Sequence, residues 1–298
     1  MRVTRLVHPV RCMLCICAMA LSPIAAEQPK AAPQWAQEEA PAWVQKYLGK
    51  SGLPAPWPDR PGLIGEGTAG IDLWQANHFV AYRAETAKYL YEQYTPLKVQ
   101  HTKGTLPEYE KQVEKFTGGA KSDREKALAL LKTMPQICRH PSIPPLGPSV
   151  PADRAMDDRQ LIESKTGWCN EQARVYVRLC QVAGIPARMI FLFYEKCPSG
   201  HVIAEFYADG RWCMADSSWL CVFPFEEGPL MSAAEAHSAE GKALAMHAYR
   251  RRWDELLKLR DDELDEKQPG AARRMIQSTS AQPPMLWAFG VMNYPLPR

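Results

Sequence analysis

The sequence lacks the features that mark several common classes of binding protein. Beyond its first 26 residues, no stretch is long and apolar enough to cross a bilayer, so we expect no stable membrane span there. It also lacks an excess of one charge, because three of its 36 basic residues fall in that first segment and its acidic residues number 33. This balance argues against electrostatic binding to nucleic acid or to an anionic membrane. There is no internal repeat.

The first 26 residues have the pattern of a secretory signal peptide. Three arginines precede a short apolar run over 12–21, and the small residues near Ala26 offer a cleavage site before Glu27. The apolar run is too short for a comfortable membrane span, although an uncleaved signal anchor is the alternative. We therefore expect the protein to be exported, either to the periplasm or out of the cell.

Apolar residues with helical spacing predict helices on both sides of a central region. One stripe predicts a helix over 72–95, and a second helix begins at Ser122, which forms a capping box with Glu125. A further stripe predicts a helix within 243–264, and residues 285–294 have the pattern of a strand.

The central region combines one helix with three strands. Apolar residues at offsets of 4, 7, 8 and 11 from Cys169 predict one face of a helix, which ends at Gly184. Runs rich in β-forming residues then predict strands over 187–194, 201–207 and 211–216. Asp209-Gly210 predicts a two-residue hairpin turn between the last two strands.

Cys169 stands in the first turn of the predicted helix, where a thiol has a chemical advantage. The unpaired N–H groups and the helix dipole stabilise a thiolate there, and the same N–H groups can hold an oxyanion. A buried structural cysteine or half of a disulfide is the alternative. Six cysteines follow the signal peptide, so they cannot all pair if Cys169 is a free nucleophile.

The predicted hairpin supplies a base and a carboxylate. If Asp209-Gly210 forms the loop, Ala208 pairs with Arg211, and the register places His201 and Asp216 diagonally on one face. Diagonal neighbours lie about 7–8 Å apart at Cα, within reach of an imidazole and a carboxylate. A slip of one residue would put the two side chains on opposite faces.

Other residues near the hairpin compete for these roles. Glu205 lies on the same face as His201 and is an alternative partner, whereas Asp209 is better explained as a turn residue. Cys197 and His201 could suggest a metal pair, but no second pair with zinc-site spacing follows. Cys213 points to the opposite face of the hairpin in this register, which favours a structural role.

Three separated blocks of sequence resemble the transglutaminase-like superfamily. The first two are GWCNEQA at 167–173 and AGIPAR at 183–188, and the third joins HVIAEFY at 201–207 to GRW at 210–212 and Asp216. Val202-Ile203 stands where the family often has Ala-Trp, a change that alters the pocket wall and leaves the three reactive residues in place.

The resemblance implies an α+β, papain-like fold in which the nucleophile helix packs on an antiparallel sheet. It implies that Cys169 attacks an amide carbonyl, that His201 protonates the departing amine, and that Asp216 orients the histidine. A thioester acyl-enzyme would then pass to water or to an amine. We expect a peptide or protein substrate and neither a metal nor another cofactor. The alternative is a non-catalytic module that binds peptide or cell-envelope partners.

These patterns divide the chain into four segments. They are a signal peptide (1–26), a proline-rich leader and helical region (27–117), a transglutaminase-like core (118–222) and a helical C-terminal extension (223–298). The sequence does not indicate an oligomeric state or which cysteines pair.

Overall fold

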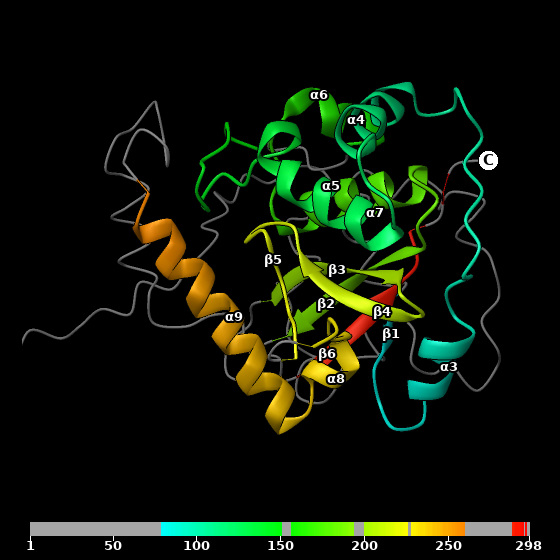
Figure 1. The fold of residues 1–298 in the computed structure, drawn as a ribbon, viewed down its shortest axis with the longest axis vertical. Helices are drawn as coiled ribbons and strands as arrows, with labels where there is room; N and C mark the ends of the chain where they lie inside the picture. The colour runs from blue at the N-terminus through cyan, green and yellow to red at the C-terminus, as the bar shows by residue number, and fades with distance from the viewer. Residues whose placement is uncertain are drawn as a thin grey trace, which may run out of the picture.

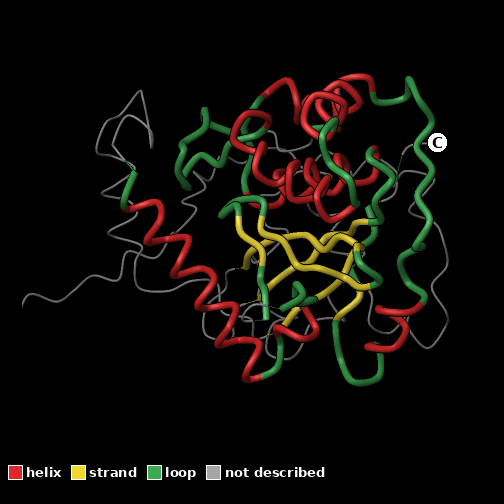
Figure 2. The backbone as a smooth tube through the Cα atoms, in the orientation of Figure 1, coloured by secondary structure: helices red, strands yellow, loops and turns green. Residues whose placement is uncertain are grey.

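The computed structural model describes residues 79–150, 156–193, 200–225, 228–259, 288–294 and 296. The predicted signal peptide, the leader up to residue 78 and Cys197 lie outside these residues. Within them the fold is α+β, as predicted, with seven helices and one six-stranded sheet. Figures 1 and 2 show a layer of helices over one face of the sheet and a long helix that crosses beside the other.

The sheet is antiparallel, and its strands come from distant parts of the chain. The strands are β1 (Val80–Ala81), β2 (Ala187–Phe193), β3 (Gly200–Ala208), β4 (Arg211–Asp216), β5 (Cys221–Val222) and β6 (Ala288–Met292). Their spatial order is β1-β6-β2-β3-β4-β5. The last strand in the chain therefore lies inside the sheet, between β1 and β2. It falls within the strand predicted over 285–294.

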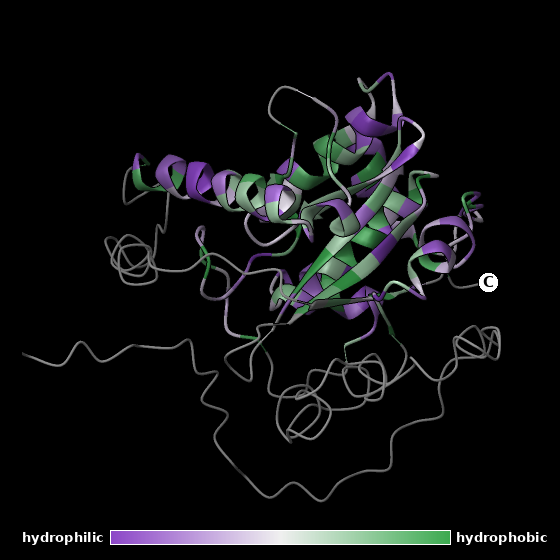
Figure 3. Ribbon diagram, turned by 90° about the horizontal axis from the view of Figure 1, so that it is seen from below, coloured by the Kyte–Doolittle hydropathy of each residue, from purple (hydrophilic) through white to green (hydrophobic). Residues whose placement is uncertain are grey.

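The helices pack on both faces of the sheet. They are α3 (Ala87–Glu92), α4 (Pro107–Thr117), α5 (Asp123–Ile137), α6 (Asp158–Ser164), α7 (Cys169–Val182), α8 (Ala233–Ala236) and α9 (Ala239–Leu257). One apolar cluster joins α4, α5, α6 and α7 to the sheet, and a second joins α3, α8 and α9 to the opposite face. Figure 3 shows hydrophobic residues concentrated along the sheet, whereas the end of α9 farthest from it is mainly hydrophilic.

The helix predicted from Cys169 is confirmed as α7, the most deeply buried helix of the fold. Every residue from Asn170 to Gln181 is buried, so this helix is enclosed on all sides. It ends as predicted, because Gly184 takes the positive φ of 82° that a glycine adopts without strain.

The single helix predicted over 72–95 is confirmed only over Ala87–Glu92 and is wrong over residues 79–86. Val80 and Ala81 form β1, and a helix begins only at Ala87. Between them the Thr86 hydroxyl donates to the Ala81 carbonyl at 2.7 Å and accepts from the Arg83 N–H at 2.9 Å, which turns the chain. The local apolar pattern favoured a helix, but pairing with the distant strand β6 takes precedence.

The start of α5 differs in one detail from the predicted capping box. Ser122 is the N-cap, and its hydroxyl accepts the N–H of Glu125 at 3.1 Å. The Glu125 carboxylate, however, accepts from the N–H of Lys121 at 2.6 Å. The predicted helix start is confirmed. The Glu125 side chain bonds the N–H of Lys121 instead of the N–H of Ser122 that a capping box uses.

Gly167 is required by close packing immediately before α7. A Cβ atom added there would lie 2.5 Å from Glu171 Cβ and 3.2 Å from Cys138 Sγ. Real carbon atoms do not approach this closely, so the glycine lets the chain enter the helix against these two side chains.

Gly167→Ala is expected to destabilise the fold by about 1–3 kcal/mol, because it overpacks a buried contact. Gly119→Ala is the control, since a Cβ there meets nothing within 4 Å. Urea denaturation monitored by circular dichroism measures both variants. Equal midpoints for the two would contradict the proposed packing constraint.

Candidate active site

Cys169 is the first residue of α7 and is partly exposed. The preceding residue, Trp168, is the N-cap and provides no side-chain hydrogen bond to the helix. The first-turn N–H groups are therefore not capped by that side chain, as an oxyanion site requires. All five cysteines within the described part of the chain are free thiols, and the other four are buried. Cys169 is thus the most accessible thiol in that part.

The predicted hairpin register is confirmed. Ala208 pairs with Arg211, and the pairing continues in register to Ala204 and Ala215. Asp209 and Gly210 form the turn with φ values of 54° and 76°, the left-handed conformation of a two-residue hairpin loop.

This register brings the His201 and Asp216 side chains together. Nε2 of His201 lies 2.7 Å from Oδ2 of Asp216, and both side chains are buried. Cys169 lies close enough to the imidazole to help raise the pKa of His201. Because Nε2 is engaged by Asp216, the ring nitrogen left for the thiol is Nδ1. The structure therefore connects the three residues predicted from the sequence.

Comparison with known proteins shows a family similarity in the middle of the chain. Residues 110–217 match the sequence model of the transglutaminase-like superfamily, and this range includes Cys169, His201 and Asp216. This range of the chain is therefore similar to the core of that superfamily. A search of curated proteins found no match.

Two solved structures have a partial likeness to this chain. A candidate cysteine protease from Cytophaga hutchinsonii has 20% sequence identity and a TM-score of 0.32, over 47% of this chain and 44% of its own. The periplasmic domain of TgpA from Pseudomonas aeruginosa has 19% identity and a TM-score of 0.31, over 41% and 45% respectively. The chain spans less than half the length of each of these structures.

Asp216, which lies at the end of the matched range, is held by four hydrogen-bond donors. Oδ1 accepts from the backbone N–H groups of Ser218 and Trp219, each at 2.9 Å. Oδ2 accepts from His201 and from the hydroxyl of Tyr249, each at 2.7 Å. Burial raises the pKa of Asp216, but His201 and these other donors outweigh it and hold the pKa below its usual value. The carboxylate therefore stays ionised although it is fully buried.

His201 has a strongly perturbed pKa. Burial lowers the pKa, but the charge and hydrogen bond of Asp216, with a contribution from Cys169, raise it to about 10. The imidazolium is therefore the favoured form of this residue at neutral pH, as expected for the acid that protonates a departing amine.

The alternative partner Glu205 is engaged elsewhere. Its Oε2 lies 2.7 Å from Nη2 of Arg188, and both side chains are fully buried. Its Oε1 accepts from the Tyr91 hydroxyl at 2.9 Å and from the Ala233 N–H at 2.6 Å. These contacts make Glu205 a structural residue and leave Asp216 as the histidine partner.

His140 is a second buried histidine near the site that the sequence pattern did not reveal. Its ring lies 5.3 Å from that of Trp168, with an edge-on geometry. Burial, with the charge of His201, lowers the pKa of His140 to about 3. Nδ1 accepts the Ser142 N–H at 3.1 Å, so the neutral ring carries its proton on Nε2. His140 is therefore a neutral hydrogen-bond donor beside the charged His201–Asp216 pair.

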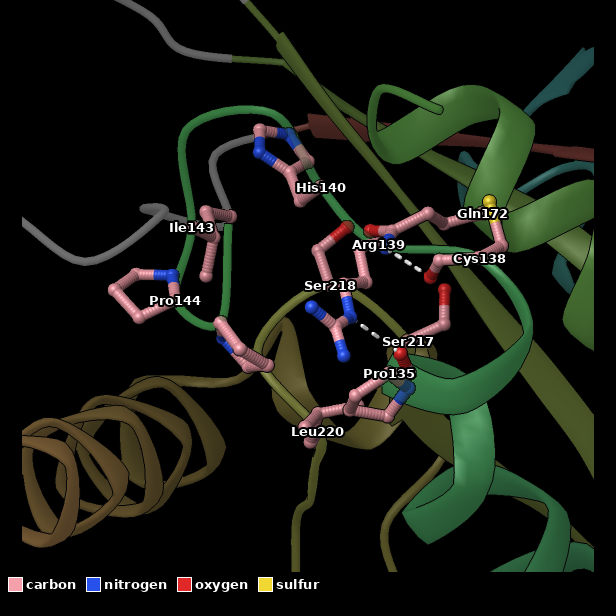
Figure 4. A pocket seen from close by; sticks show the side chains of 11 residues that line it. Pro135, Cys138, Arg139, His140, Ile143, Pro144, Gln172, Ser217, Ser218 and Leu220 are labelled. Carbon is pink, nitrogen blue, oxygen red and sulfur yellow. Dashed lines mark hydrogen bonds between the residues drawn. The ribbon is translucent and has the colours of Figure 1, made fainter. Parts of the chain in front are cut away.

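A small hollow of mixed polar and apolar lining lies beside the turn that follows Asp216 (Figure 4). Its volume is about 10 Å³, roughly the space that one water molecule needs. Gln172 donates from Nε2 to the Cys138 carbonyl at 2.8 Å, whereas its Oε1 and the hydroxyl oxygens of Ser217 and Ser218 have no partner among the described residues.

No metal centre is evident in the described ranges, where no three His, Cys, Asp or Glu side chains form a group able to hold a metal ion. In the same ranges, no helix is both long and apolar enough to cross a membrane.

The raised pKa of His201 predicts a pH-dependent stability. Its contribution is complete below the ordinary histidine pKa of about 6.5 and is lost as the pH rises toward about 10, because the folded state binds the proton more tightly. We expect the free energy of unfolding to fall across this window and to fall less in His201→Gln. Urea titrations at a series of pH values measure both slopes. Equal slopes for the two proteins would contradict the assignment of this proton to His201.

Proposed function

We propose that this chain is an exported thiol enzyme that cleaves or transfers amide bonds of peptides or proteins. The observation that carries the proposal is the connected set of Cys169 at the start of α7 and the His201–Asp216 pair at 2.7 Å. A nucleophile, a base and an orienting carboxylate in this order form the minimal machinery of covalent acyl transfer.

The first half of the reaction forms a thioester. The Cys169 thiolate attacks the amide carbonyl, and the oxyanion that develops is stabilised by backbone N–H groups in the first turn of α7. When the carbon–nitrogen bond breaks, protonated His201 gives its proton to the departing amine. The products are a free amine and an acyl group bound to Cys169 through sulfur.

The second half regenerates the thiolate. His201, now neutral, accepts a proton from water or from an acceptor amine, which attacks the thioester carbonyl. Water yields a carboxylic acid and an amine yields a new amide, and in both cases Cys169 leaves as the thiolate. Asp216 holds the imidazole in one orientation and stabilises its charged form throughout.

Export of this enzyme is supported by the signal-peptide pattern of residues 1–26. Peptide and protein amides are the proposed substrates because they carry the carbonyl that this set of residues is suited to attack. Peptide release from a protein substrate indicates hydrolysis, whereas incorporation of a fluorescent primary amine indicates transfer. Both assays require Cys169→Ala as the blank.

The activated thiol is tested by alkylation with dilute iodoacetamide at pH 6, followed by mapping of the modified cysteine by mass spectrometry. An ordinary thiol is less than about 1% ionised at this pH. We expect selective labelling of Cys169, and a rate at least about tenfold lower in His201→Ala, because the imidazolium that stabilises the thiolate is lost.

His247→Ala is the matched control, since this histidine is exposed on α9. The buried thiols Cys180 and Cys213 provide an internal reference, because burial raises their pKa to about 12 and about 11 respectively. Uniform slow labelling of all thiols, unaffected by His201→Ala, would contradict the proposal that the chain is a thiol enzyme. It would favour the non-catalytic binding module instead.

A further inference from the structure

Tyr249 contributes a hydrogen bond to the site from outside the matched core. It lies on α9, whereas the family match ends at residue 217. Its side chain is 4% exposed, and its hydroxyl donates to Oδ2 of Asp216 at 2.7 Å. This is the same oxygen, at the same distance, that accepts from His201.

One stripe of α9 holds this contact in place. Tyr249, Arg252 and Trp253 are spaced so that they lie on the same side of the helix. Nε of Arg252 donates to the Trp219 carbonyl at 2.9 Å, and the Trp253 and Trp219 rings lie 5.5 Å apart. All three side chains therefore contact the short segment that begins with Asp216.

The ring of Tyr249 is also fixed beneath the sheet. It packs edge-on against Phe223 at 5.0 Å and belongs to the apolar cluster that joins α8 and α9 to the sheet. The phenol therefore reaches Asp216 from a rigid position, so that its hydroxyl can define the plane of the carboxylate.

The two oxygens of Asp216 are held differently. Oδ1 is fixed by two backbone N–H groups of its own turn, from Ser218 and Trp219. Oδ2 accepts from no backbone N–H of the described residues and is shared by the imidazole and the phenol. The phenol is thus the contact that keeps Oδ2 directed at the imidazole when the histidine gives up its proton during the reaction.

We propose that Tyr249 is a positioning residue that acts through Asp216, and that α9 is therefore a working part of the catalytic site. The inference rests on the proposed thiol chemistry. It assigns the C-terminal extension a role in the reaction in addition to its packing against the sheet.

The competing explanation is that Tyr249 only anchors α9. A double-mutant cycle separates the two, because a residue that acts through Asp216 has no further effect once that carboxylate is gone. The variants are Tyr249→Phe, Asp216→Asn and their combination, in the full chain. Tyr109→Phe is the control, since its buried hydroxyl donates at 2.9 Å to the Asp158 carbonyl, outside the site.

The measurement is the rate of Cys169 alkylation across pH, with the thermal midpoint of each variant recorded alongside. We expect Tyr249→Phe to slow labelling about tenfold, the effect of losing a hydrogen bond to a charged group. In the plot of labelling rate against pH, the acidic limb of this variant moves to higher pH, because loss of the donor makes Asp216 easier to protonate. We expect Tyr109→Phe to leave the labelling rate and the acidic limb unchanged. In the Asp216→Asn background, adding Tyr249→Phe causes no further change in either.

The outcomes distinguish this inference from the proposed function. If His201→Ala labels like the unmodified chain, the thiol enzyme itself is wrong. Two results would overturn the positioning role while His201→Ala still labels slowly. In one, Tyr249→Phe keeps the original labelling rate and pH profile. In the other, Tyr249→Phe slows labelling as much in the Asp216→Asn background as in the unmodified chain. If Tyr249→Phe does not fold, Arg252→Ala loosens α9 with the hydroxyl retained. Arg252→Ala is then expected to slow labelling and to move the acidic limb to higher pH. An unchanged plot of labelling rate against pH would overturn the inference.

Discussion

A buried carboxylate with four hydrogen-bond donors is the constraint on which the site depends. A charge in an apolar interior is costly unless its lone pairs are satisfied, and Asp216 is fully buried. Its donors come from its own turn, from His201 on β3 and from Tyr249 on α9. One carboxylate therefore couples the hairpin, the long helix and the His201 imidazole, so that the geometry of the proposed site and the tertiary structure share the same contacts.

The alternation of the sheet explains why these elements meet. His201, Ile203 and Glu205 share one face of β3, and that face is covered by α8 and α9. The helix that begins at Cys169 packs on the other face. Because His201 is near the start of its strand, its ring reaches Asp216 in one layer and Cys169 in the other.

The parts of the site that depend on local signals could be predicted. Asp209-Gly210 fixes the hairpin register, and Gly184 ends the helix that begins at Cys169, because both turns need left-handed backbone conformations. The parts that depend on partners distant in the sequence could not be predicted. Residues 80–81 form a strand only because β6 lies beside them. The apolar stripe of α9 was visible in the sequence, but which carboxylate its tyrosine meets was not. Likewise, Glu205 remained a rival of Asp216 until its contact with Arg188 was known.

The place of β6 in the sheet has a consequence for how the protein acquires its structure. This strand comes after α9 in the chain yet inserts between β1 and β2, so the sheet has a gap until residues 288–292 are available. Such non-local pairing slows folding, because loop-closure entropy is lost before the contact forms. A chain built this way completes its sheet only after residues 288–292 have been synthesised, well after its central region.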